Sequence, residues 1–163
     1  MAEDIFRRIR TLLDNAGVDY EHLEHDHVHG SRDAAKVRGT TLAEAAKALV
    51  LKDRTSGGLS LFVVAGDRKL DLKAIKKDIL GTKNISLAPP EEVLSATGCA
   101  VGSVPPFGNI FKLPVYFDQH LKDTQQQIVF SAGTHTDSIR MRTEDFLTVV
   151  RPTVAAYSRA AEP

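Results

Sequence analysis

The chain has 163 residues, of which 42% are hydrophobic and 26% are charged, and its 21 basic residues balance 21 acidic ones. This composition excludes an intrinsically disordered chain, and a single cysteine excludes a disulfide framework. Balanced charge also argues against a protein that wraps nucleic acid mainly by neutralising phosphates. We expect one domain over residues 1–163 in a reducing compartment. Because the charged start does not resemble a signal peptide, the expected location is cytoplasmic.

The first part of the chain predicts a helix, a strand and a second helix. Apolar residues from Ile5 to Leu13 recur at helical spacing, and Gly17 follows as a C-cap. Residues 18–25 alternate weakly, as strand residues do, and Ser31 can cap a short helix through Val37.

The middle of the chain predicts a β-hairpin followed by two helices. Strands over 47–52 and 59–64 are joined by a Ser-Gly-Gly turn. A capping box formed by Thr41 and Glu44 precedes the first strand. The helices that follow are expected over residues 71–80, with Asp71 as the N-cap, and over residues 91–97 after two prolines.

The last third predicts three strand-like pieces and a closing helix. The strands are expected over 111–116, 127–131 and 138–141, and the helix over 143–150. Single helices that alternate with hairpin-paired strands indicate an α/β (α+β) fold: a mixed, largely antiparallel sheet flanked by helices.

Lys47 is a cation on an apolar strand face. Strand periodicity places it on the same side as Leu49 and Leu51. One interpretation is that Lys47 lies at the strand end and extends its ammonium to water. The other is an ammonium at the rim of a pocket, where it would hold a phosphate or a carbonyl oxygen.

Two polar or glycine-rich segments are further candidates. The segment from Gly102 to Gly108 contains two adjacent prolines, so it is either a tight connector or a rigid loop that presents backbone groups to a ligand. The segment from Ser131 to Ser138 gathers small polar residues around His135 and is either a hydrogen-bonded turn or one wall of a site.

Three closely spaced histidines and the single cysteine are candidates for metal binding and catalysis. His25, His27 and His29 alternate and could share one strand face, which would suit zinc. The Asp-His pair of binuclear zinc hydrolases is absent from this run, and we interpret it mainly as an exposed turn, with no metal expected. Cys99 lies in an apolar setting that favours a buried thiol over a nucleophile.

In chain order, the segments 46–53, 102–108 and 132–139 resemble the YbaK/prolyl-tRNA editing domain family. The likeness extends from about residue 18 to residue 150. This resemblance implies a compact sheet, partly closed like a barrel and flanked by helices. It also implies hydrolysis of the ester of a wrongly charged aminoacyl-tRNA, with no cofactor.

The resemblance also implies roles for particular residues. Lys47 would contact the terminal adenosine phosphate or the ester region. Gly102 and Pro106 would place backbone groups near the ester, and Gly133 and His135 would lie beside the aminoacyl group. The further substrate-binding residues expected on this basis are Ser103, Val104, Phe107, Gly108, Ser131 and Thr134.

The expected function is therefore that of a free-standing trans-editing deacylase, with tRNA-Pro carrying Ala or Cys as the first substrate to test. Its partners would be the acceptor end of aminoacyl-tRNA and an aminoacyl-tRNA synthetase. The activated ester and the neighbouring ribose hydroxyl would reduce the need for protein acids and bases, so that orientation and electrostatics would supply the rate. A non-catalytic binding module and a metal-dependent hydrolase remain as alternatives. Six basic residues within 68–83 could form a local surface for tRNA, or only a solvated helix face.

Overall fold

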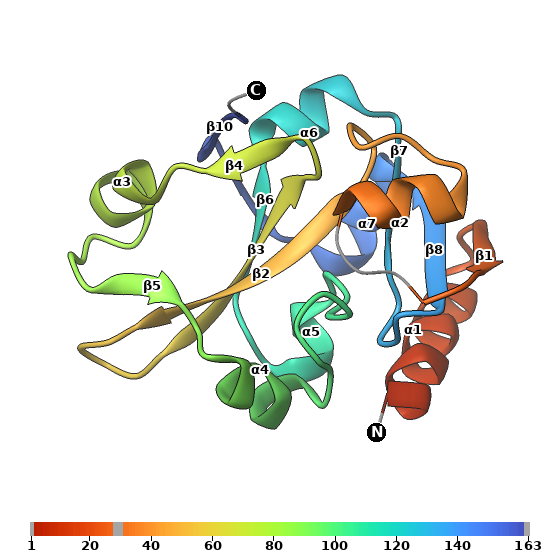
Figure 1. The fold of residues 1–163 in the computed structure, drawn as a ribbon, viewed down its shortest axis with the longest axis horizontal. Helices are drawn as coiled ribbons and strands as arrows, with labels where there is room; N and C mark the ends of the chain where they lie inside the picture. Colours follow the sequence, from red (N-terminus) through yellow and green to blue (C-terminus); the bar gives the residue numbers. More distant parts are fainter. Residues whose placement is uncertain (1, 28–30, 162–163) are drawn as a thin grey trace.

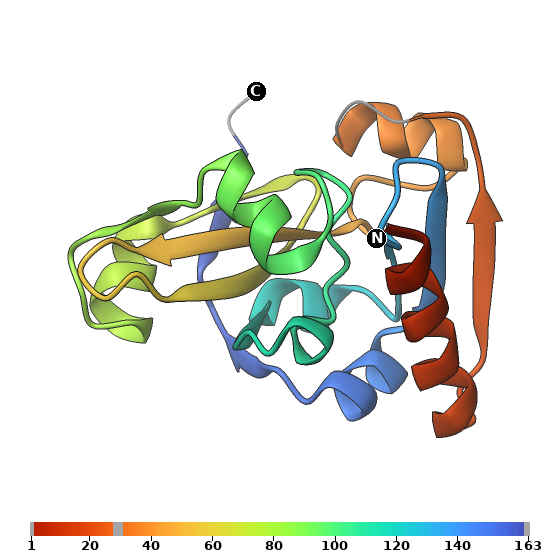
Figure 2. The same ribbon diagram turned by 90° about the horizontal axis from the view of Figure 1, so that it is seen from below.

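The computed structural model describes residues 2–27 and 31–161. At one end of the molecule lies a three-stranded antiparallel sheet in the order β1-β8-β7 (Figure 1). Its strands are β1 (Tyr20–Glu24), β7 (Gln127–Ser131) and β8 (Asp137–Arg142). Helix α1 (Ala2–Ala16) lies at the same end (Figure 2) and buries its apolar face in the core through Ile5, Ile9 and Leu13.

A five-stranded sheet in the order β5-β2-β3-β6-β9 forms the rest of the framework. Its strands are β2 (Ala46–Asp53), β3 (Leu59–Ala65), β5 (Ile85–Leu87), β6 (Val115–Asp118) and β9 (Thr153–Ala155). Strands β2 and β3 form the predicted hairpin, while β6 pairs in parallel with both β3 and β9. An isolated parallel bridge between Ala45 and Val129 joins the start of β2 to β7, so the two sheets meet there.

The remaining elements flank these sheets. A two-stranded ribbon pairs β4 (Arg68–Leu70) with β10 (Ser158–Ala160). The helices are α2 (Ser31–Arg38), α3 (Leu72–Ala74), the π-helix η1 (Ile75–Ile79), α4 (Pro90–Thr97), α5 (Gly108–Phe111), α6 (Gln119–Thr124) and α7 (Thr143–Val150). No helix among the described residues has the length and apolar character needed to cross a membrane.

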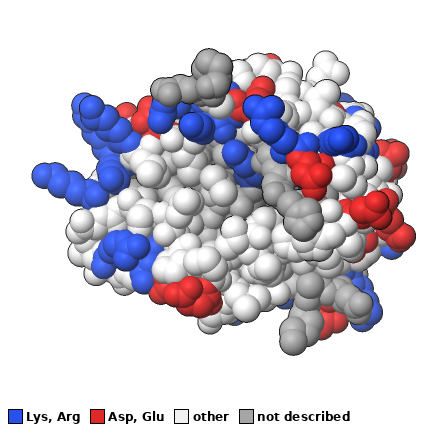
Figure 3. Space-filling model, in the orientation of Figure 1, with Lys and Arg blue, Asp and Glu red and all other residues white. Residues whose placement is uncertain are grey.

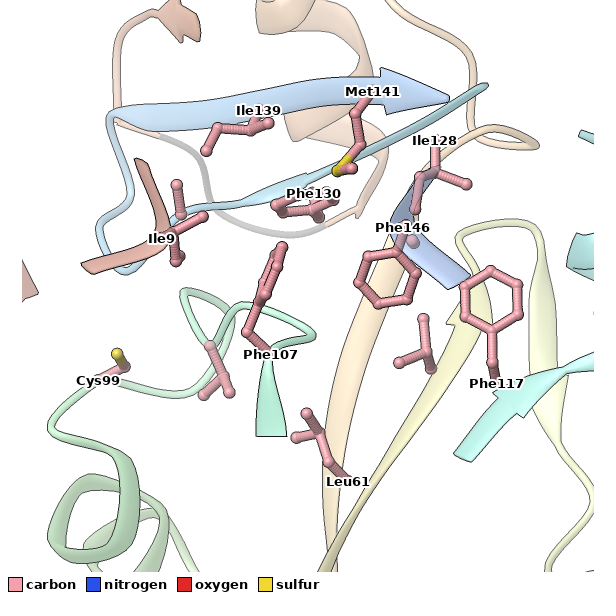
Figure 4. Packing of buried hydrophobic residues seen from close by; sticks show 14 of the residues in the cluster. Ile9, Leu61, Cys99, Phe107, Phe117, Ile128, Phe130, Ile139, Met141 and Phe146 are labelled. Atoms are coloured by element: carbon pink, nitrogen blue, oxygen red, sulfur yellow. The ribbon is translucent and has the colours of Figure 1, made fainter. Parts of the chain in front are cut away.

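Two apolar clusters lie on opposite faces of the β2–β3 hairpin. In the larger one, Phe107 packs edge-on against Phe130 and Phe146 (Figure 4). In the smaller one, Phe62 packs against Tyr157, whose hydroxyl group lies 2.5 Å from the carbonyl oxygen of Val63. Alternate residues of β2 therefore face different clusters, as strand periodicity requires.

The structure confirms the mixed, largely antiparallel α/β architecture, but its described strands do not close into a barrel. The strand expected over 111–116 is wrong at its start. Residues 108–111 form α5, Lys112 ends that helix at a φ of 59°, and β6 begins only at Val115. Thr41 and Glu44 do exchange capping-box hydrogen bonds, although the residues between them form a turn.

Candidate functional site

A pocket of about 460 Å³ lies where β2, β7, the end of α2 and the loop after α4 come together. Most of its lining is small or apolar. The described lining residues are His27, Ala34, Arg38, Ala45, Ala46, Lys47, Ala48, Leu49, Val101, Gly102, Val104, Val129, Phe130, Ser131 and His135. Each of the three sequence motifs that suggested a site therefore contributes to this pocket.

Lys47 lies near the start of β2, opposite Val64 of β3, with its side chain on the pocket. Burial lowers the pKa of this ammonium, and nearby Lys69 lowers it further, while Asp67 acts in the opposite direction. An ammonium that has lost part of its hydration interacts more strongly with an anionic ligand than a fully solvated one does. The position thus favours the pocket interpretation of Lys47 over full exposure to water.

The loop after α4 is tied to the turn between β7 and β8. The Gly102 carbonyl accepts a hydrogen bond from the Ser131 hydroxyl at 3.1 Å, and the Ser103 carbonyl accepts one from the Gly133 N–H at 3.0 Å. Gly102 has a φ of 90°, and a Cβ built on it would lie 3.4 Å from the His135 ring. Glycine is therefore favoured at this position both by backbone conformation and by the close approach of His135.

Other residues of the loop have structural surroundings. Pro106 is buried, and the hydroxyl group of buried Ser103 donates to the Ala100 carbonyl at 2.8 Å. Phe107 is fully buried in the larger cluster, where it does not line the pocket. A Cβ on Gly108 would collide with Val115. Of this loop, Gly102 and Val104 face the pocket together with Val101.

Asp137 organises the turn that carries His135. Its carboxylate accepts hydrogen bonds from the Thr134 hydroxyl at 2.7 Å and from His22 Nε2 at 2.8 Å. Burial would raise the pKa of Asp137, but these hydrogen bonds and the charge of nearby histidines outweigh it and lower the pKa overall. Thr134 is thus engaged in the turn and is not among the pocket-lining residues.

The described histidines of the alternating run have different surroundings. His25 Nε2 lies 2.8 Å from the Ser138 hydroxyl, whereas the ring of His27 contacts that of His135 in a tilted arrangement with centroids 4.5 Å apart. His29 lies outside the described residues. Within the described part of the chain, the side chains with metal-ligand spacing are instead those of His22, Glu24 and Asp137. The hydrogen bond between His22 and Asp137 already explains why these two side chains lie close together.

Sequence reasoning missed Arg38 as a pocket residue. Its Nε donates to the Ser138 hydroxyl at 2.7 Å, and its Nη2 donates to the Ser131 hydroxyl at 3.1 Å. Burial lowers the pKa of this guanidinium to about 10. In the sequence, Arg38 is one of several charges at the end of a short helix, and no local pattern distinguishes it from solvated neighbours such as Lys36.

With this geometry in view, comparison with known proteins identifies the class. Residues 25–149 match the family model for the aminoacyl-tRNA editing domain, and the chain belongs to that family. The multifunctional Ser/Thr-tRNA deacylase ProXp-y of Escherichia coli strain K12 is 34% identical over 157 residues, which cover 95% of this chain and 93% of that protein.

Two further relatives agree with this assignment. The prolyl-tRNA editing protein ProX of Acetoanaerobium sticklandii is 27% identical over 125 residues, covering 74% of this chain and 76% of the relative. A crystal structure of a protein proposed to be a trans-editing enzyme for prolyl-tRNA synthetase superimposes with a TM-score of 0.79 at 28% identity, covering 96% of this chain and 98% of the other. The resemblance stated from the sequence motifs is therefore confirmed.

Proposed function

We propose that this protein hydrolyses the ester of tRNA carrying a wrongly attached small amino acid, with serine and threonine as its first substrates. The observation that carries the proposal is the convergence of three distant motifs, through Lys47, Gly102 and His135, on one pocket. Membership of the editing family and the deacylase relatives support ester hydrolysis as the reaction. The E. coli relative, named as a Ser/Thr-tRNA deacylase, supports the choice of amino acid.

In the proposed mechanism, water attacks the aminoacyl carbonyl with the help of the neighbouring ribose hydroxyl. Lys47 holds the 3′ end of the substrate by charge, near the phosphate or the ester. Backbone groups of the Gly102 loop and the His135 ring orient the aminoacyl group. Fixed dipoles and a partly desolvated cation stabilise developing negative charge without reorganising during the reaction, and this is the main source of rate in such a site.

Selectivity would come from the size of the pocket. Alanine and valine side chains form much of the lining, including Ala34, Ala48, Val101 and Val104. A wall of this kind admits small side chains and excludes large ones sterically, as in double-sieve editing. It discriminates poorly among small residues, so alanyl and cysteinyl esters on tRNA-Pro belong in the same test.

We further propose that residues 1–163 act as one editing domain in the cytoplasm, where the substrate is made. Support for one domain comes from α1, which lies outside the family match but packs into the same core as the matched residues. The expected partners are the acceptor end of aminoacyl-tRNA and, as in relatives that are proline–tRNA ligases, a synthetase.

The decisive experiment incubates the protein with a panel of mischarged tRNAs, namely seryl-, threonyl-, alanyl- and cysteinyl-tRNA-Pro and seryl-tRNA-Thr, with correctly charged prolyl-tRNA-Pro as the control. We expect faster release of small amino acids than the spontaneous rate and no release of proline. Binding without turnover on every substrate would favour the non-catalytic module. Loss of activity in chelator would favour the metal-dependent hydrolase.

A further inference from the structure

Arg38 is a partly buried cation whose charge has no acidic partner in the described part of the chain. Its side chain donates hydrogen bonds to the hydroxyl groups of Ser131 and Ser138, which carry no charge. A guanidinium has five N–H donors, so these two bonds leave three available for other acceptors. Since burying an unpaired charge costs free energy, a group held this way is most stable when an anion completes its surroundings.

Lys47 is the second cation that lines the pocket, and the fold brings it near Arg38. The parallel bridge between Ala45 and Val129 sets the start of β2 beside β7. Lys47 and Ser131 each lie two residues after a bridge residue, and both line the pocket. Ser131 is also the residue that receives the Arg38 Nη2 hydrogen bond. The described lining contains no Asp or Glu, so the two cations face a pocket without acidic side chains.

We propose that Arg38, held by the hydroxyl groups of Ser131 and Ser138, is a second phosphate-binding residue of the pocket beside Lys47, whose own contact belongs to the proposed function. This inference rests on the proposed function. In an aminoacyl-tRNA the amino-acid carboxyl group is esterified, and the nearest anion to the ester is the phosphodiester on the 5′ side of the terminal nucleotide. The planar fork of an arginine matches two phosphate oxygens at once, whereas an ammonium acts as a point charge. Arg38 would then set the position of the phosphate, and Lys47 would add attraction.

The test measures binding of two small probes, adenosine 5′-monophosphate and adenosine, by titration calorimetry at low and high salt. For the unaltered protein we expect the monophosphate to bind at least tenfold more tightly, with the difference shrinking as salt rises. Arg38→Met should weaken monophosphate binding by roughly tenfold to a hundredfold and leave adenosine binding nearly unchanged. Arg38→Lys should recover only part of the loss, because it restores charge without the fork.

Matched variants separate this role from a structural one. Lys36→Gln removes an exposed charge from the same helix and should leave both affinities unchanged. Ser131→Ala keeps the size of the residue, so it tests the hydroxyl group even if Arg38→Met folds poorly. Equal affinity of the unaltered protein for the two probes would overturn the inference, as would an Arg38→Met protein that loses both probes equally.

The two proposals can fail separately. If monophosphate binding follows the expected pattern but no mischarged tRNA is hydrolysed, the phosphate-binding role of Arg38 stands and the catalytic function fails. If deacylation proceeds while the two probes bind alike, the function stands and the phosphate-binding role of Arg38 is wrong.

Discussion

At the scale of single residues, Lys47 and Arg38 show how differently two cations can be recognised. Lys47 stands out in the sequence because it interrupts an apolar strand face, and the structure places it on the pocket. Arg38 is found only in the tertiary structure, where it reaches serines about a hundred positions away in the chain. Burial removes hydration from both cations and lowers the pKa of each.

Lys47→Met should lower kcat/KM for a mischarged tRNA by about a hundredfold or more, since in the proposed mechanism its charge holds the reacting end. The matched control is Lys52→Met, at a position of the opposite parity on β2, where the ammonium pairs with Glu92 at 2.6 Å. Circular dichroism and the thermal midpoint check that both variants fold. Full activity in a folded Lys47→Met protein would remove this residue from the site.

At the scale of elements, the loop between α4 and α5 serves the pocket and the core with different residues. Gly102 and Val104 line the pocket, while Phe107 joins the aromatic cluster and Gly108 passes close to the chain before β6. The family motif in this loop therefore combines residues that line the pocket with residues that pack the loop against the core. Composition alone does not separate these two groups.

Gly108→Ala should destabilise the protein by roughly 1–3 kcal/mol, because the added methyl group meets Val115 and lies 2.7 Å from the Leu113 carbonyl oxygen. Urea unfolding monitored by circular dichroism measures the change. Asn109→Ala, at the exposed neighbouring position, is the control and should stay within about 0.5 kcal/mol of the unaltered protein. An unchanged free energy of unfolding in Gly108→Ala would contradict this prediction and show that the loop accommodates the methyl group without strain.

At the scale of the whole molecule, the net charge is zero but the basic side chains are unevenly distributed over the surface. Lys and Arg side chains gather on the side where β4, α3 and η1 lie, at the left of Figure 3. Asp67 and Lys69, next to this side, both act on the pKa of Lys47, Asp67 raising it and Lys69 lowering it. We propose that the acceptor stem of a tRNA whose 3′ end occupies the pocket lies over this side, with few phosphates contacted in total.

The double variant Lys73→Glu/Lys77→Glu should weaken tRNA binding by about tenfold at 50 mM salt, since each contact contributes to counterion release. The plot of log K against log salt should become shallower, while hydrolysis at saturating tRNA stays near its original rate. Arg7→Glu/Arg142→Glu makes the same charge change on α1 and β8, at the other end of the molecule. If both double variants weaken tRNA binding equally, net charge alone explains the effect, and the side of β4, α3 and η1 is not a specific tRNA-binding surface.

Much of the fold follows from local pattern. The amphipathic spacing of α1, the Ser-Gly-Gly turn of the hairpin and the proline-led start of α4 each indicate an element that the structure contains. The missed elements depend on distant partners. Strands β9 and β10 are three residues each, and between them Tyr157 is buried with its hydroxyl group near the carbonyls of Val63 and Tyr116. Burial also raises the pKa of this hydroxyl group.

The sequence by itself determined the class of the protein, because turn residues, periodicity and the three ordered motifs are local properties of the chain. Tertiary structure alone decided which residues of those motifs face the pocket. The tertiary structure buries the Phe107 side chain in the core and brings Arg38 beside Ser131, because burial and side-chain direction depend on strands that meet only after folding. It also decided what a balanced charge means for this protein. Equal numbers of acids and bases set the total, and the fold gathers some of the bases on the side of β4, α3 and η1 and places Lys47 and Arg38 at the pocket.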